Sequence, residues 1–167
     1  MNDPEAFPLW PRAEGLASDQ PRERELSSVP AHQAADAESR ARRPGRVLIV
    51  DDSRDAREMY TLYFRLHGYH AFMANDGHAA VEMATKFKPD VIVMDFAMPG
   101  MSGISATHQL KNNPRTKSSA VILLTGHQAR AIAEGALEMG VDVFLTKPCL
   151  PEDLETHVRR LIEDRRR

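Results

Sequence analysis

Short apolar runs alternate with amphipathic stretches from Arg46 to the end of the chain. Five of these runs predict strands, and four of the five consist mainly of Val, Ile, Leu or Phe. The predicted strands cover residues 47–50, 69–73, 91–94, 120–124 and 142–145. Continuous apolar runs of this length are typical of strands that are buried on both faces of a parallel sheet.

The segments between the predicted strands carry helix signals. Ser53 is predicted to be an N-cap, Asp76-Gly77 begins a second helix, and Pro151 suits the first turn of the last helix. Further helices are predicted near 104–111 and 129–139. The predicted apolar faces are Ala56, Met59, Tyr60, Tyr63 and Leu66 in the first helix, Ala80, Met83, Ala84 and Phe87 in the second, and Leu154, Val158, Leu161 and Ile162 in the last.

Strict alternation of strand and helix predicts an α/β fold with right-handed crossovers and five helices flanking the sheet. For five strands the common doubly wound, flavodoxin-like order is 2-1-3-4-5, in which strands 1 and 3 are neighbours at the switch point. Asp51-Asp52 follows the first strand, and Asp95 follows the apolar run of the third. We therefore expect these three acids to meet at the carboxyl edge of the sheet.

The composition of the chain is that of an ordinary globular protein. The 167 residues are 42% hydrophobic and 28% charged, with a net charge of -2, so there is no overall basic field for nucleic acid. A single cysteine, Cys149, excludes an internal disulfide and favours a reducing cytosol. With no signal peptide and no apolar run of roughly 20 residues, we expect a cytoplasmic protein without membrane insertion.

The first part of the chain has a different composition. Residues 1–45 hold six of the eleven prolines among charged and small residues. Such a segment buries too little apolar surface to offset the entropy of ordering it. We predict a disordered extension over residues 1–45 and one domain over 46–167.

The predicted edge of the sheet gathers side chains suited to phosphoryl chemistry. Converging carboxylates repel each other, and Mg²⁺ would relieve that repulsion, although an acidic surface patch without an ion is the alternative. Thr125 and Lys147, at the ends of the fourth and fifth strands, would add a hydroxyl donor and a cation. In such a site Asp95 is positioned as the nucleophile that forms an aspartyl-phosphate.

From Arg46 to Glu163 the chain resembles the receiver domain of two-component response regulators. The matching motifs are Val50-Asp51-Asp52, Met94-Asp95 with Met98-Pro99-Gly100 and Gly103, Thr125-Gly126, and Phe144-Leu145-Thr146-Lys147-Pro148. Each motif is short, and their order and spacing carry the resemblance.

The resemblance implies a role for each matching residue. Asp95 would be the phosphoacceptor. Asp52, Asp95 and the backbone carbonyl of Ala97 would ligate Mg²⁺ directly, and Asp51 would hold it through water. Lys147 would pair first with Asp95 and then with the phosphoryl group. The peptide bond between Lys147 and Pro148 would be cis. The remaining implied roles belong to the switch residues, Thr125 as a donor to the phosphoryl group and Phe144 as a rotamer switch.

The resemblance also implies partners. The phosphoryl donor would be a sensor histidine kinase or a histidine phosphotransfer protein. A downstream protein would bind the face of the fourth helix, fifth strand and fifth helix, around 128–138, Phe144 and 152–160. A phosphorylation-dependent homodimer is a further form of output, and direct nucleic acid binding is not expected. The protein would be a switch that assists its own phosphorylation and dephosphorylation, not an enzyme acting on metabolites.

Two other functions stay open at this point. A phosphatase with an aspartyl-phosphate intermediate usually has a second Asp two residues after the nucleophile, where this chain has Ala97. A receiver-like module that binds its partner independently of phosphate is the stronger alternative. Ala97 and His127 also flank the expected approach to Asp95, so they are candidates for setting the lifetime of the aspartyl-phosphate. The alternative for His127 is that it only starts the helix that follows the fourth strand.

Overall fold

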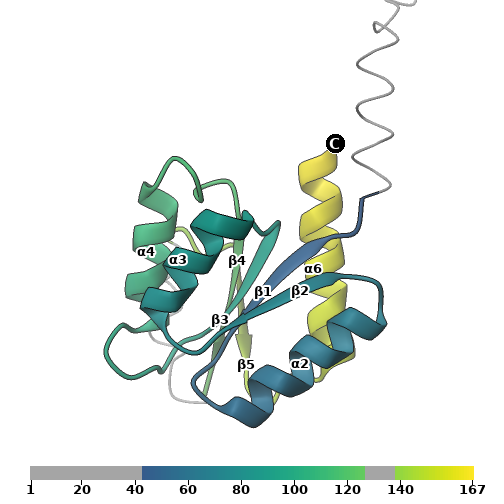
Figure 1. Cartoon of the computed structure of the whole chain (residues 1–167), viewed down its shortest axis with the longest axis horizontal. Helices are drawn as coiled ribbons and strands as arrows, with labels where there is room; N and C mark the ends of the chain where they lie inside the picture. The colour runs from purple at the N-terminus through teal and green to yellow at the C-terminus, as the bar shows by residue number, and fades with distance from the viewer. Residues whose placement is uncertain (1–42, 127–137) are drawn as a thin grey trace, which may run out of the picture.

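The computed structural model describes residues 43–126 and 138–167 of the chain. Its sheet has five parallel strands in the order β2-β1-β3-β4-β5, which confirms the predicted topology (Figure 1). The strands are β1 (Arg46–Val50), β2 (His70–Ala74), β3 (Val91–Asp95), β4 (Ala120–Thr125) and β5 (Val143–Thr146). Since β1 lies between β2 and β3, the carboxyl ends of β1 and β3 are neighbours.

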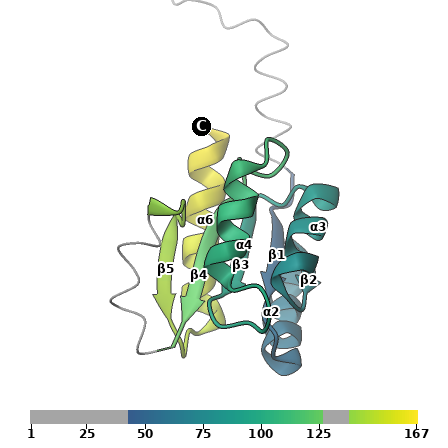
Figure 2. The same ribbon diagram turned by 90° about the vertical axis from the view of Figure 1, so that its left-hand side faces the viewer.

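Helices cover both faces of the sheet. In the described residues these helices are α2 (Arg54–Leu66), α3 (Gly77–Phe87), α4 (Gly103–Asn112) and α6 (Pro151–Arg166). Figure 2 shows the sheet between them, with α2 and α6 on one face and α3 and α4 on the other. Most of the helix predicted near 129–139, and His127, lie outside the described residues.

Successive residues of the central strands alternate between two apolar cores. Val47 and Ile49 of β1 join the core under α2 and α6, whereas Leu48 and Val50 join the core under α3 and α4. All four are essentially inaccessible to solvent. Burying each such side chain contributes about 1.5–3 kcal/mol, so the continuous apolar run reflects a strand that is covered on both faces.

One predicted apolar face is partly wrong. In α2 the buried residues are Tyr60, Thr61 and Phe64, while Met59 and Leu66 point to solvent with 47% and 76% of their surface exposed. Apolar residues occur all round this helix, so its spacing alone did not determine which side faces the sheet. In α3 and α6 the predicted faces agree with the core, including Ala80, Ala84, Leu154, Val158 and Ile162.

Side-chain caps fix where the helices next to the carboxylates begin. The Ser53 hydroxyl accepts a hydrogen bond from the Ala56 N–H at 3.4 Å, and the Asp76 carboxylate accepts one from the Ala79 N–H at 2.8 Å. The Ser53 cap and a helix start at Asp76-Gly77 were predicted from the sequence, and each cap supplies a partner for an N–H that the helix leaves unpaired. The Lys147–Pro148 peptide bond is cis, as the resemblance implied.

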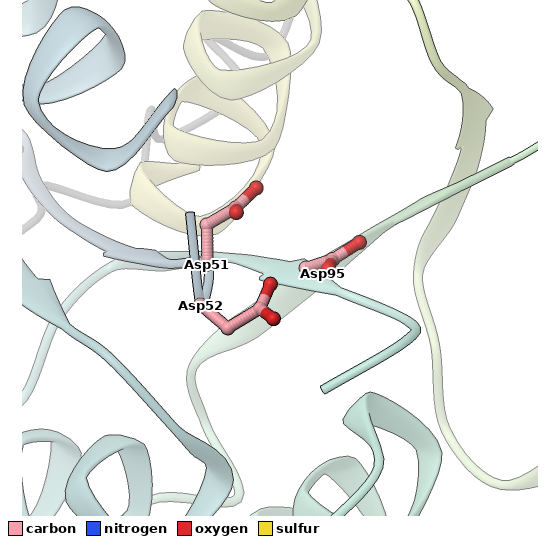
Figure 3. A group of neighbouring side chains, drawn as sticks. All are labelled: Asp51, Asp52 and Asp95. Atoms are coloured by element: carbon pink, nitrogen blue, oxygen red, sulfur yellow. The ribbon is translucent and has the colours of Figure 1, made fainter. Parts of the chain in front are cut away.

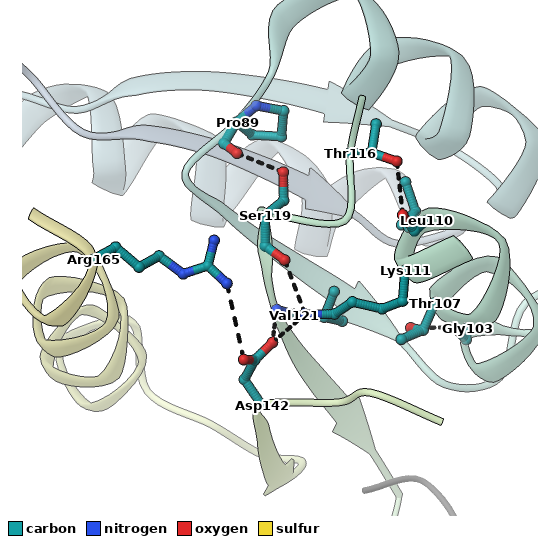
Figure 4. Close-up of polar contacts among 10 residues, drawn as sticks. All are labelled: Pro89, Gly103, Thr107, Leu110, Lys111, Thr116, Ser119, Val121, Asp142 and Arg165. Atoms are coloured by element: carbon teal, nitrogen blue, oxygen red, sulfur yellow. Dashed lines mark hydrogen bonds and ion pairs between the residues drawn. The ribbon is translucent and has the colours of Figure 1, made fainter. Parts of the chain in front are cut away.

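Asp142 contacts several elements at the edge of the sheet where the strands begin (Figure 4). Its Oδ2 atom accepts hydrogen bonds from the Val121 backbone N–H at 2.8 Å and from Lys111 Nζ at 2.7 Å. Its Oδ1 atom lies 3.9 Å from a guanidinium nitrogen of Arg165. One carboxylate therefore links α4, β4 and the end of α6.

We predict that Gly103→Ala destabilises the protein, because the added Cβ would collide with the Asp95 backbone carbonyl and approach Leu123 Cδ1 at 2.9 Å. Overpacking of this kind typically costs about 1–3 kcal/mol of the free energy of unfolding. Urea denaturation measures it. Gln109→Ala, at an exposed position of the same helix, is the matched control, and an equal effect of both substitutions would contradict the close packing at Gly103.

Candidate functional site

Three carboxylates gather where β1 and β3 end. Val50 pairs with Met94 in the parallel ladder, so the residues that follow them, Asp51 and Asp95, lie side by side. Carboxylate oxygens of Asp51, Asp52 and Asp95 lie within 4.8 Å of one another (Figure 3). Asp51 and Asp95 are buried and Asp52 is exposed. The convergence predicted from the switch point is therefore present.

Lys147 reaches this cluster from the end of β5. Its Nζ lies 2.8 Å from Asp51 Oδ2 and 2.9 Å from Asp95 Oδ1. Its backbone N–H donates to the Thr125 carbonyl oxygen at 2.7 Å, which fixes the start of the loop relative to β4. Pairing with Asp95 was expected from the resemblance, whereas pairing with Asp51 was not.

Burial and like charges set the electrostatics of the cluster. Burial raises the pKa of Asp95. Repulsion from the neighbouring carboxylates of Asp51 and Asp52 raises the pKa of Asp95 further, and Lys147 only partly offsets these effects. Burial alone would lower the pKa of Lys147, but its hydrogen bonds and attraction to Asp51 and Asp95 outweigh burial and leave that pKa raised. The cluster therefore holds a permanent cation beside a carboxylate that is costly to ionise.

The carboxylate oxygens are unequally occupied. Asp51 uses one oxygen for Lys147 and accepts the Ser53 N–H with the other at 2.9 Å. Asp95 uses Oδ1 for Lys147, and within residues 43–126 and 138–167 no hydrogen bond is recorded to its Oδ2 or to the carboxylate of Asp52. Hard oxygen ligands of this number and charge fit Mg²⁺, which binds one or two carboxylates and keeps several waters.

The remaining predicted residues surround this cluster. Thr125 ends β4 and is buried, and its hydroxyl donates to the Gly126 carbonyl oxygen at 3.2 Å. Phe144 lies in β5, partly buried against the core under α3 and α4. Ala97 is exposed in the loop after β3. The roles of these three side chains in a switch stay predictions.

Sequence reasoning missed the groups that hold the backbone of the cluster. A guanidinium nitrogen of Arg57 donates to the Asp51 carbonyl oxygen at 2.7 Å and lies 3.4 Å from that of Asp52. Arg57 lies one helical turn after the Ser53 cap. This spacing could have indicated that its guanidinium group reaches back to the carbonyl oxygens of Asp51 and Asp52. Gly103 packs directly against the Asp95 carbonyl, a contact that only the tertiary structure reveals.

Comparison with known proteins agrees with this geometry. Residues 47–159 match the family described as response regulator receiver domain. The chain belongs to the response regulator receiver family.

Individual relatives show how far the similarity extends. Protein PilH of Pseudomonas aeruginosa is 36% identical over 109 residues, which cover 65% of this chain and 90% of PilH. Response regulator MprA of Mycobacterium leprae is 32% identical over 117 residues, which cover 70% of this chain but 50% of MprA. Against MprA and the similarly sized PhoB and TcrX proteins, this chain spans about half of the relative's length.

Solved structures share the same fold. The chemotaxis protein CheY4 of Vibrio cholerae superposes with a TM-score of 0.67 at 29% identity, covering 71% of this chain and 99% of CheY4. The receiver domain of a LuxO repressor protein from Vibrio parahaemolyticus gives a TM-score of 0.68 at 28% identity, over 74% of this chain and 93% of that domain. In the described part of this chain, no helix is long and apolar enough to cross a membrane.

We predict that Asp95→Asn raises the free energy of unfolding in metal-free buffer at neutral pH, because it removes a buried charge that Lys147 only partly compensates. A raised carboxylate pKa means that the folded state disfavours ionisation, so the stability cost is present above that pKa and disappears as the pH falls through it. The difference between the variant and the wild type should therefore shrink in acid. Thermal melting at neutral and acid pH measures it.

Added Mg²⁺ should reverse this order. The wild type gains stability with Mg²⁺ by mass action, whereas Asp95→Asn and Asp52→Asn gain little. Asp55→Asn, which removes an exposed carboxylate in the first turn of α2, is the control and should respond like the wild type. Equal stabilisation of all four proteins by Mg²⁺ would contradict the assignment of the cation site.

Proposed function

We propose that this chain is a phosphorylation-dependent switch whose Asp95 accepts a phosphoryl group from a phosphohistidine of a sensor histidine kinase or phosphotransfer protein. The observation that carries the proposal is the state of the Asp95 carboxylate. Lys147 holds one of its oxygens, and the other has no recorded partner among the described residues. The same carboxylate belongs to the cluster with Asp51 and Asp52. A nucleophile needs such an orientation with one lone pair available.

The reaction is a transfer between two residues. An Asp95 oxygen attacks phosphorus, the bond from phosphorus to the histidine nitrogen breaks, and the nitrogen keeps the electron pair. Mg²⁺ held by Asp52, Asp95 and the Ala97 carbonyl, with Asp51 acting through water, would neutralise charge on the phosphoryl oxygens. Lys147 then pairs with a phosphoryl oxygen instead of with the Asp95 oxygen.

The new group biases the fold through charge. A phosphoryl group adds about −1.5 to −2 charges and three strong acceptors. Thr125 is the hydroxyl donor proposed to answer it, and inward movement of Thr125 would open space that Phe144 fills. Because Phe144 has no hydroxyl, burial alone would favour its inward rotamer. The face made by the helix expected to follow β4, by β5 and by α6 is then the proposed output surface for a downstream protein or a second copy.

The chain assists this reaction on itself and does not turn over metabolites. We place the reaction in the cytoplasm, where a chain with one cysteine, half-buried Cys149, stays reduced. A receiver-like module that binds partners regardless of phosphate is the second candidate. The burial of Asp95 favours the switch over that module. Burial raises the pKa of this carboxylate and makes its ionised form costly, and strongly perturbed carboxylates of this kind are concentrated at functional sites.

Incubation with acetyl phosphate and Mg²⁺ tests the proposal directly. We expect the wild type to gain the mass of one phosphoryl group, and Asp95→Asn to gain none. Asp164→Asn, on the exposed side of α6, should behave like the wild type. Intact mass spectrometry reads the result. If neither acetyl phosphate nor a phosphorylated kinase modifies the folded wild type, the phosphate-independent module is the correct reading.

The exposed side of α2 is proposed as the surface that meets the phosphoryl donor. Met59, Leu62 and Leu66 recur along the helix at spacings of three and four residues, with 47%, 60% and 76% of their surface exposed. The helix starts beside Asp52, so a partner helix on this stripe would lie next to the carboxylates. Helices commonly bind through apolar anchors at this spacing.

We predict that Leu62→Glu slows phosphotransfer from a phosphorylated kinase by about tenfold or more, because a charge at a buried contact weakens docking. Phosphorylation by acetyl phosphate, which needs no docking surface, should be unchanged. Met139→Glu, at a position of similar exposure away from α2, is the control. Equal loss with both donors would indicate damage to the site or fold, and no loss with the kinase would exclude this surface.

A further inference from the structure

A second concave site lies at the edge of the sheet opposite the carboxylates. Two clefts of about 480 and 510 Å³ adjoin there and share Arg46, Asp90, Ser118 and Arg165. Arg46 opens β1, Asp90 precedes β3 and Ser118 lies just before β4. Five-residue strands place this amino edge about 16 Å from the carboxyl edge. We call the two clefts together the amino-edge groove.

Positive charge is concentrated in the amino-edge groove. Its cationic lining residues are Arg43, Arg46, Lys88, Arg115, Arg165 and Arg166. Asp90 is the one carboxylate among the described residues that line it. The whole chain carries a net charge of -2, so this excess of cations is a local feature and not a consequence of composition.

The fold neutralises only part of this charge. Arg46 is anchored, with its Nε 3.8 Å from Asp90 and a guanidinium nitrogen donating to the Phe87 carbonyl oxygen at 3.1 Å. Arg165 shares Asp142 with Lys111, and its 3.9 Å separation from that carboxylate is long (Figure 4). For the exposed side chains of Lys88 and Arg115, no ion pair is recorded with any described residue. The groove therefore has cationic capacity to spare.

We propose that the amino-edge groove binds a compact polyanion that carries two or more phosphate groups. Guanidinium groups present a fork of donors that matches phosphate oxygens, and an ammonium group adds a point charge. The groove offers several guanidiniums from different elements, the ammonium group of Lys88, and the exposed Ser118 as a hydroxyl-bearing residue. Recognition by charge and hydrogen bonding follows from this lining.

The shape and the walls of the groove favour a small ligand over a nucleic acid. Its volumes lie in the range of small-molecule clefts, about 300–1,000 Å³. Proteins that bind single-stranded nucleic acid stack bases on aromatic side chains. Among the described lining residues the apolar ones are Pro44, Pro89 and Ile162, and none is aromatic. The lining suits a phosphate chain better than a base.

Titration calorimetry with sodium tripolyphosphate, in metal-free buffer at low salt, tests the proposal on the full chain. We expect the wild type to bind tripolyphosphate. The double variant Lys88→Gln/Arg115→Gln should bind it with an affinity that is lower by about tenfold or more. Arg54→Gln/Arg160→Gln removes two exposed charges elsewhere and is the matched control, with affinity within about twofold of the wild type. Thermal melting confirms that each variant is folded.

Further ligands and one further variant sharpen the test. ATP binding more tightly than AMP would support recognition of the phosphate chain. Asp95→Asn should bind tripolyphosphate like the wild type, which separates this groove from the carboxylate site. The proposal is overturned if the wild type does not bind, if Lys88→Gln/Arg115→Gln binds as tightly as the wild type, if Asp95→Asn loses binding, or if single-stranded RNA of equal charge binds more tightly than tripolyphosphate.

Discussion

The site depends on one electrostatic constraint, which is that three carboxylates are held together at the end of a parallel sheet. The backbone fixes Asp51 and Asp95 beside each other because β1 and β3 are paired in register. Lys147 compensates part of the repulsion by binding both side chains. The compensation is incomplete, since the pKa of Asp95 stays raised. A site in this state gains free energy from any added cation.

The rest of the fold positions these few groups. Two apolar cores, one on each face, make the central strands rigid and leave the acids at their carboxyl ends. Arg57 and the Ser53 N–H hold the loop that carries Asp51 and Asp52, and Gly103 lets α4 begin against the Asp95 carbonyl. The cis bond after Lys147 belongs to the loop that brings the lysine across β4. Function is thus concentrated on loops, while precision comes from the strands.

Much of this could be predicted from the sequence, for physical reasons. Continuous apolar runs and strict alternation predicted a doubly wound parallel sheet, and the common strand order of such sheets placed Asp51, Asp52 and Asp95 together. The inward face of α2 could not be read in the same way, because Met59 and Leu66 are as apolar as the residues that are buried. Two sets of contacts could not be predicted, namely those of Lys147 with both Asp51 and Asp95 and those of Asp142 with three different elements. Both sets depend on how loops fold back on the sheet, and no local spacing in the sequence encodes such folding.

The central claim is that Asp95 is the residue that carries the phosphoryl group. Borohydride reduces an acyl phosphate of aspartate to homoserine, so reduction of the protein after incubation with acetyl phosphate and Mg²⁺, followed by peptide mapping, locates the modified position. The account predicts homoserine at position 95 and aspartate retained at 51 and 52. Homoserine at either of those positions, or at none in a folded protein, would contradict it.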